Sequence, residues 1–311
     1  MFRVIIYTII TITNFTFSLA QVKTEEFLIR NKEIELPGTL SFAKKNTPLI
    51  IWVHGSGNVD RNGNQKPMIK ANYIEQFRKA INKNNIAFFS YDKRTANPKN
   101  TIAIKENGVL IIDFINDVKK VVNRFKDDKR FTSIILAGHS QGSLIAMVAL
   151  DNVDKYISIA GAGETIDRVL IKQITKQNPF YGAITEKHLK ELKETGKIKQ
   201  VDPNLMSVFA PQNQPFLSSW ITLNPIDEIK KVKIPTLIIN GDKDIQLQIT
   251  DGEKLKKAQP KADFKIIKNM NHILKHIEKD EDNMISYSSA NFPISKELIK
   301  TITRFIFTSK N

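Results

Sequence analysis

One serine stands in a sequence context that could make its hydroxyl a nucleophile. Ser140 lies in the pentapeptide Gly138-His139-Ser140-Gln141-Gly142, which is the pattern G-x-S-x-G, between the apolar run 133–137 and the segment 141–150. In a strand–turn–helix of this kind the serine occupies a strained turn at a helix N-terminus, where free amide groups and the helix dipole favour developing negative charge. Gly138 and Gly142 supply the small residues that such a turn needs on either side of the serine. The pattern therefore indicates nucleophilic serine chemistry.

A serine hydroxyl needs a general base, and the chain offers only five histidines. In the order serine, acid, histidine expected around such a turn, the base follows Ser140, which leaves His188, His272 and His276. His272 comes just after the last predicted strand and is the preferred base, with His276 as the fallback. His188 lies in a charged segment and is expected at the surface.

The base in turn needs a carboxylate to orient it. Asp242 and Asp244 both follow the predicted strand 236–240. Asp244 is favoured because it lies farther beyond the strand end, while Asp242 remains an alternative. Asp251 and Glu164 are weaker candidates.

Two backbone amides are needed to bind an oxyanion. The residue after the nucleophile, Gln141, supplies one, and the glycine-rich loop 54–57 supplies the other, with Ser56 as the expected donor. The loop lacks the Lys-Ser/Thr ending and the glycine spacing of phosphate-binding loops. His54 and His139 are interpreted as structural loop residues.

Short β-branched runs alternate with longer amphipathic ones along the chain. Strands are predicted at 26–30, 34–43, 49–53, 86–91, 133–137, 156–160, 236–240 and 264–267. Helices are predicted at 69–83, 107–126, 141–150, 252–258 and 295–307. Because apolar strands alternate with helices, we expect an α/β fold whose mostly parallel sheet is covered on both faces, with an antiparallel pair at its start.

The segment 164–233 interrupts this alternation and, at about 70 residues, is too long for an ordinary loop. It contains two predicted helices, 166–177 and 185–194, and Gly196 would end the second. It would leave the sheet at the carboxyl edge, where α/β sheets bind ligands, so it is predicted to form a cap over a core made of 21–163 and 234–311. Four residues are candidates for lining a substrate pocket: Phe209, Phe216, Leu217 and Trp220. The alternative that these side chains only fasten the cap to the core stays open.

Composition excludes several kinds of site and partner. The 311 residues contain no cysteine, which rules out disulfides, thiolate nucleophiles and thiolate metal sites. The net charge is +15, but the lysines are scattered without an aromatic-interleaved basic stripe. We therefore expect a solvated basic surface and no nucleic-acid partner. No metal or organic cofactor is expected.

Residues 1–20 read as a separate segment. Arg3 precedes an apolar run at 4–12, and the small residues Ser18 and Ala20 follow. This arrangement predicts a secretory signal peptide cleaved after Ala20, which would leave an exported, periplasmic or secreted protein without a membrane span. An uncleaved N-terminal anchor is the alternative.

Five charged residues in two predicted loops lie near the expected site: Asp60, Arg61, Asp92, Lys93 and Arg94. The favoured interpretation is an ion-pair network that holds the loops together. In the alternative, Arg61 or Arg94 steers an acidic group of a substrate.

Several motifs, in this order, resemble those of α/β-hydrolase-fold serine hydrolases: HGSGNVDRNGN at 54–64, YDKR at 91–94, GHSQGS at 138–143, LIINGDKDIQLQ at 237–248 and MNHILK at 270–275. The chain is similar to the exported bacterial branch of the serine aminopeptidase/monoacylglycerol-lipase-like group. The resemblance covers nearly all of the chain after residue 20. It departs from the usual pattern at Thr95 and Ser143, where glycines are frequent.

The resemblance implies a triad of Ser140, Asp244 and His272, with Ser56 and Gln141 as oxyanion donors. It implies hydrolysis of carboxylic esters through an acyl-enzyme, and we expect small to medium acyl groups in a small-molecule ester substrate. An exported aminopeptidase or amidase is the alternative, and Glu164 or Glu186 would then hold a substrate amine. A non-catalytic binding protein is a further alternative.

Overall fold

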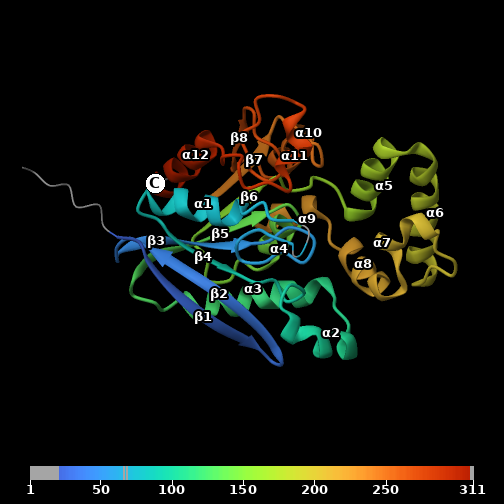
Figure 1. Cartoon of the computed structure of the whole chain (residues 1–311), viewed down its shortest axis with the longest axis horizontal. Coiled ribbons are helices and arrows are strands. Elements are labelled where there is room, and N and C mark those ends of the chain that lie inside the picture. Colours follow the sequence, from blue (N-terminus) through green and yellow to red (C-terminus); the bar gives the residue numbers. More distant parts are fainter. Residues whose placement is uncertain (1–20, 66, 68, 309–311) are drawn as a thin grey trace, which may run out of the picture.

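An eight-stranded sheet forms the centre of the described chain, in the order β1-β2-β4-β3-β5-β6-β7-β8 (Figure 1). The computed structural model describes residues 21–65, 67 and 69–308. The strands are β1 (Lys23–Asn31), β2 (Ile34–Phe42), β3 (Thr47–Val53), β4 (Ala87–Tyr91), β5 (Phe131–His139), β6 (Lys155–Ile159), β7 (Thr236–Gly241) and β8 (Asp263–Ile267). β1 pairs antiparallel with β2, and β2 antiparallel with β4, while all later neighbours are parallel. The predicted α/β fold with an antiparallel opening pair is confirmed.

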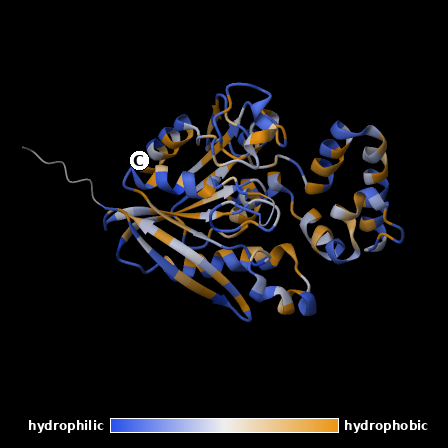
Figure 2. Ribbon diagram, viewed as in Figure 1, coloured by the Kyte–Doolittle hydropathy of each residue, from blue (hydrophilic) through white to orange (hydrophobic). Residues whose placement is uncertain are grey.

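Helices cover both faces of the sheet, which explains the continuous apolar strands. All seven residues of β3 are buried, as expected of a strand with helices on both sides. α1 (Tyr73–Asn82) and α12 (Lys296–Phe307) pack on one face. The other face is covered by α3 (Ile111–Phe125), α4 (Gln141–Val148), α9 (Pro225–Lys231) and α10 (Ile249–Ala258). Figure 2 shows hydrophobic residues along the central strands.

Two helix predictions are corrected by backbone conformation. The helix predicted at 69–83 begins only at Tyr73, because Asn72 before it adopts the left-handed φ of 48°. The helix predicted at 107–126 is α3, which begins only at Ile111, and a separate helix, α2 (Thr101–Asn107), precedes it. Gly108 ends α2, and its φ of 69° is a conformation that glycine adopts without strain.

A group of helices between β6 and β7 lies beside the sheet (Figure 1). It consists of α5 (Ile166–Gln177), α6 (Pro179–Thr195), α7 (Met206–Phe209) and α8 (Gln214–Ile221), with 3₁₀ turns at Pro203–Leu205 and Pro211–Asn213. Gly196 ends α6 with a φ of 72°. We call α5–α8 the cap. It has its own hydrophobic core, and α9 returns the chain to the sheet.

The expectation of a surface position for His188 is wrong. His188 is 5% exposed, and its Nε2 accepts a hydrogen bond from the Asp202 amide at 3.1 Å inside the cap.

Outside the cap and the sheet layers lie α11 (Asp282–Ser286) and a 3₁₀ turn at Pro98–Asn100. None of the helices in the described part of the chain has the length and apolar character needed to cross a bilayer.

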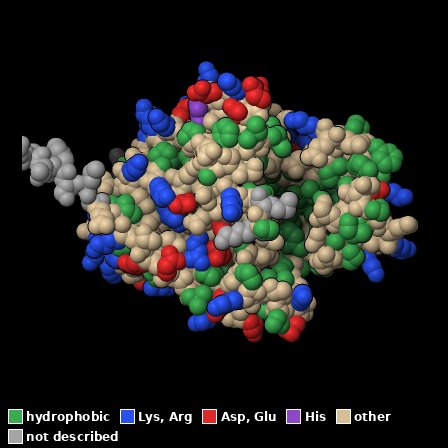
Figure 3. Space-filling view, viewed as in Figure 1, with side chains coloured by type: hydrophobic (Ala, Val, Ile, Leu, Met, Phe, Trp, Pro, Cys, Tyr) green, Lys and Arg blue, Asp and Glu red, His purple; other side chains and the backbone are tan. Residues whose placement is uncertain are grey.

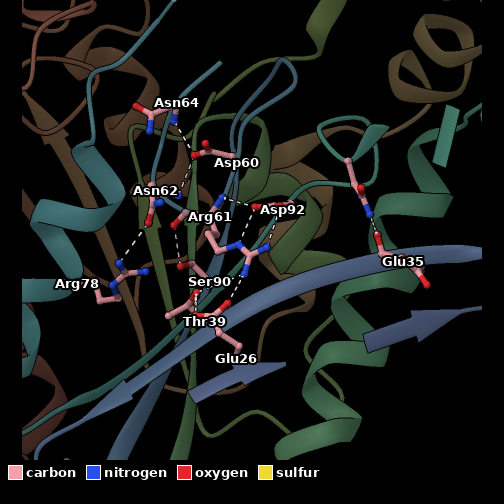
Figure 4. Close-up of polar contacts among 11 residues, drawn as sticks. Glu26, Glu35, Thr39, Asp60, Arg61, Asn62, Asn64, Arg78, Ser90 and Asp92 are labelled. Carbon is pink, nitrogen blue, oxygen red and sulfur yellow. Dashed lines mark hydrogen bonds and ion pairs between the residues drawn. The ribbon is translucent and has the colours of Figure 1, made fainter. Parts of the chain in front are cut away.

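Ion pairs fasten the loops after β3 and β4, as the favoured interpretation predicts for Arg61, Asp92 and Arg94. Asp60 forms no ion pair with a described residue and instead accepts the amides of Asn62 and Asn64. Arg61 binds both carboxylate oxygens of Asp92, at 2.9 and 3.0 Å, and also contacts Glu26 on β1 (Figure 4). Arg94 binds both oxygens of Asp117 on α3, at 2.7 and 2.8 Å. Neither arginine is therefore free to steer a substrate.

The Arg94–Asp117 pair is buried, with side-chain exposures of 7% and 2%. We predict that Asp117→Ala lowers the free energy of unfolding by about 3–5 kcal/mol, because it leaves the guanidinium buried without its main partner. Urea denaturation measures this effect. The matched control is Glu194→Ala, which breaks the exposed pair with Lys190 and should cost less than about 1 kcal/mol. Equal losses in the two variants would contradict this account.

Candidate active site

Ser140 occupies a strained turn between β5 and α4. Its φ of 54° and ψ of −122° lie outside the regions that most residues adopt. The flanking glycines are required by close backbone packing. A Cβ on Gly142 would lie 2.2 Å from the carbonyl oxygen of Val53, and one on Gly138 would lie 2.3 Å from the carbonyl oxygen of Gly142. The G-x-S-x-G pattern thus reflects a turn pressed against the end of β3.

His272 and Asp244 form a buried hydrogen-bonded pair beyond the carboxyl ends of β7 and β8. Nδ1 of His272 lies 2.8 Å from Oδ2 of Asp244, and the two side chains are 5% and 0% exposed. The other oxygen of Asp244 accepts the amides of Gln246 and Leu247 at 2.8 and 2.9 Å. Because a carboxylate oxygen accepts this hydrogen bond, the contact favours a proton on Nδ1, and in the neutral imidazole Nε2 then keeps the lone pair.

The alternative acids and base make other contacts. Oδ1 of Asp242 accepts the amide of Asn269 at 2.6 Å, which ties together the loops after β7 and β8. Asp251 accepts the amide of Gln248 at the start of α10. Nε2 of His276 lies 3.7 Å from Glu278 in a partly exposed pair. Among the candidates, the structure thus brings only Asp244 to His272.

His139 joins the loop of Ser140 to the loop of His272. Its Nε2 donates to the carbonyl oxygen of His272 at 2.7 Å, and its ring stacks on Trp52 with centroids 5.8 Å apart. Burial lowers the pKa of His139 to about 3, so the ring is neutral. The pKa of His54 is likewise lowered to about 3 by burial and by the nearby Lys93. Both histidines have the structural character expected of them.

Two backbone amides beside Ser140 are available to a ligand. Gln141 is the first residue of α4, so its N–H has no acceptor within the helix. The Ser56 amide, in the loop after β3, makes no hydrogen bond to another described residue. A Cβ on Gly55 would lie 3.2 Å from Cβ of Ser140, so this loop passes directly beside the serine.

A cavity of about 990 Å³ lies between these loops and the cap. Ser56, Ser140 and Gln141 line it together with Phe216, Leu217 and Trp220 of the cap. Figure 3 shows hydrophobic side chains around the hollow between the cap and the core.

The expectation that Phe209 lines the pocket is wrong. Phe209 is fully buried inside the cap, with its ring 5.4 Å from that of His188, and does not line the cavity. Its function is to fill the core of the cap.

Glu164 also lines the cavity, but its carboxylate is already paired. It forms ion pairs with Lys172 on α5 and Lys254 on α10. Although partial burial raises the pKa of Glu164, the hydrogen bonds from the two lysines lower it more, so it stays ionised and neutralised. Glu186 is exposed on α6 and does not line the cavity.

The expectation that Lys93 belongs to an ion-pair network is wrong, because Lys93 forms no ion pair with a carboxylate of the described residues. It is 4% exposed and lines the cavity, and its Nζ donates to the carbonyl oxygen of Gly55 and to Oε1 of Gln141, both at 2.8 Å. Burial lowers the pKa of its ammonium group to about 7. The flanking Asp92 and Arg94 form the ion pairs described above, while Lys93 lines the site.

In the described part of the chain, no three His, Asp or Glu side chains come together in a way that could hold a metal ion. The expectation that the protein needs no cofactor stays a prediction.

Comparison with known proteins agrees with this architecture. The family model BD-FAE matches residues 38–258. No curated protein sequence is significantly similar to the chain.

Solved structures with a similar fold share little sequence with this chain. Est1E from Butyrivibrio proteoclasticus with ferulic acid bound is 16% identical over 91% of this chain and 100% of its own, with a TM-score of 0.56. The Pyrococcus furiosus esterase Pf2001 is 14% identical over 91% of this chain and 90% of its own, with a TM-score of 0.56. An acylaminoacyl peptidase from Pyrococcus horikoshii is 14% identical over 94% of this chain and 43% of its own, with a TM-score of 0.59.

The contact between His272 and Asp244 has a spectroscopic signature. We predict a one-proton resonance far downfield of the amide region in the proton NMR spectrum, from the Nδ1 proton held against the carboxylate. Asp244→Asn should remove it, because the amide side chain favours the other imidazole tautomer. Asp242→Asn should leave it in place. If the resonance is lost in Asp242→Asn and retained in Asp244→Asn, the partner of His272 is not Asp244, and the assignment is wrong.

Proposed function

The chain belongs to the BD-FAE family, and on that premise we propose that it is a serine hydrolase that cleaves carboxylic esters. The observation that carries the proposal is the buried His272–Asp244 pair at 2.8 Å, in a loop joined through His139 to the strained turn of Ser140. A neutral histidine whose tautomer is set by a carboxylate is what a serine hydroxyl needs as its base.

The proposed reaction has two halves. Nε2 of His272 takes the proton of Ser140 as Oγ attacks the ester carbonyl, and the carbonyl oxygen becomes an oxyanion bound by the amides of Ser56 and Gln141. His272 then gives the proton to the leaving alcohol, which leaves an acyl-enzyme on Ser140. Water attacks that ester with His272 again as base, releasing the acid and restoring the serine. Asp244 holds the imidazole and stabilises its charge.

The size and lining of the cavity favour a small to medium acyl group. A volume of about 990 Å³ matches that of pockets that enclose small molecules, and Phe216, Leu217 and Trp220 give it an apolar wall. The ferulic acid bound to the similar Est1E is consistent with an ester of such a size. Figure 3 shows Lys and Arg scattered among Asp and Glu on this face, which favours a small-molecule substrate over nucleic acid.

The alternative of an aminopeptidase is disfavoured by the state of Glu164. A substrate ammonium needs a free carboxylate, and Lys172 and Lys254 already neutralise this one. The exposed Glu186 does not replace it. An ester therefore fits the cavity better than an aminoacyl amide.

We predict that the protein hydrolyses p-nitrophenyl esters and that Ser140→Ala lowers kcat/KM by a factor of about 10⁴ to 10⁶, because the nucleophile is lost. Release of p-nitrophenol across a series from acetate to palmitate gives the rate and the preferred acyl length. Ser288→Ala, on an exposed turn, is the matched control and should retain full activity.

The same assay with an aminoacyl p-nitroanilide distinguishes the two chemistries. Faster cleavage of the anilide than of every ester would make the protein an amidase. Undiminished ester hydrolysis by Ser140→Ala would remove Ser140 from the mechanism.

We further propose that the protein is exported and that a signal peptidase cleaves after Ala20. This cleavage falls outside the described residues. β1 begins at Lys23, so the cleavage would leave the sheet intact. We predict that intact-mass analysis of protein from the periplasm or medium gives a chain that begins at Gln21. Ala20→Arg should retain the longer mass in the cells, because the small residue before the cut is lost. Recovery of the full-length mass from the exported wild type would contradict cleavage.

A further inference from the structure

We propose that Lys93 is a positioning residue that orients both amides of the oxyanion hole and polarises the amide of Ser56. The inference rests on the proposed function and adds a residue to it. It starts from the two hydrogen bonds of one buried nitrogen atom. Nζ of Lys93 donates to the carbonyl oxygen of Gly55 and to the side-chain oxygen of Gln141, both at 2.8 Å.

The first contact acts on the Ser56 donor through the peptide group that the two share. The carbonyl of Gly55 and the N–H of Ser56 belong to one planar trans peptide, so they point in opposite directions. Holding the carbonyl against Lys93 therefore aims the N–H of Ser56 away from Lys93. A cationic donor on the carbonyl oxygen also polarises the peptide, which makes its N–H a stronger donor.

The second contact holds the residue that carries the other donor. Gln141 contributes its backbone N–H at the first position of α4, and its side chain is 5% exposed. Because Lys93 binds Oε1 of that side chain, one amine links the loop after β3 to the N-terminus of α4. The amine of Lys93 therefore holds the N–H groups of Ser56 and Gln141 at a set distance from each other.

Lys93 itself is held in place by its backbone and by an aromatic ring. Its N–H donates to the carbonyl of Val59 at 3.2 Å, and its Nζ lies 4.6 Å from the centroid of Phe114 on α3. Both protonation states of the amine retain enough N–H groups for the two hydrogen bonds. The geometry therefore persists whether or not the amine is charged.

The electrostatic setting of Lys93 favours the transition state over the resting state. Lys93 forms no ion pair with a carboxylate of the described residues, unlike Arg61 and Arg94 beside it. A buried cation without a counterion is costly, and that cost shows in its lowered pKa. The negative charge that forms on the carbonyl oxygen during attack supplies the missing counterion. Stabilisation that arises only in the transition state raises kcat.

The test compares Lys93→Met with the wild type in ester hydrolysis and in binding of an aryl boronic acid, which forms a tetrahedral adduct on the serine. We expect kcat to fall by about 10- to 100-fold while KM changes less than about threefold, because the contact acts on the oxyanion and not on the bound ester. Affinity for the boronic acid should fall by a similar factor. Lys230→Met, on the exposed side of α9, is the control and should change neither.

A second variant keeps the experiment decisive if Lys93→Met does not fold. Gln141→Glu preserves the contact with Lys93 but gives the ammonium a counterion in the resting state, so it should also lower kcat and the affinity for the boronic acid. Unchanged kcat in a folded Lys93→Met, or in Gln141→Glu when Lys93→Met does not fold, would overturn the proposal. A rise in KM by the factor expected for kcat, with kcat itself unchanged, would make Lys93 a substrate-binding residue and would also overturn the proposal. Absence of hydrolysis in the wild type would refute the proposed function itself.

Discussion

The packing of the Ser140 turn against the end of β3 is the constraint on which the rest of the site depends. Gly142 lies so close to the carbonyls of Val53 and His54 that no side chain fits. This contact brings the loop after β3 beside the serine and forces the serine into a strained conformation. The strain is held by a sheet buried on both faces, so the site relies on the rigidity of the core.

Three loops from different strands meet at this turn, and buried polar side chains tie them together. His139 binds the carbonyl of His272, and Lys93 binds both Gly55 and Gln141. Each bond joins segments that are distant in sequence. Because buried polar groups lose free energy when they are left without a partner, these bonds specify one arrangement of the loops.

The local patterns of the sequence predicted what depends on local chemistry. The apolar runs predicted the sheet, the G-x-S-x-G pattern predicted the turn, and the positions after β7 and β8 favoured Asp244 over Asp242 and His272 over His276. Predictions failed where tertiary packing decides. The helix predicted at 107–126 begins only at Ile111, after the left-handed Gly108 that ends α2. Phe209 fills the core of the cap, because burial inside an insertion cannot be distinguished from a pocket wall by residue type. The position of Lys93 depends on loops that meet only in the fold.

The central claim is that Ser140 is a nucleophile activated by His272. Titration with a p-nitrophenyl phosphonate tests it most directly, because the phosphonate bonds covalently to an activated serine and releases one p-nitrophenol as it does so. We expect one equivalent of p-nitrophenol per chain and a phosphonyl group on the peptide that contains Ser140, with both lost in His272→Ala. Absence of release, or a phosphonyl group on another residue, would contradict the account.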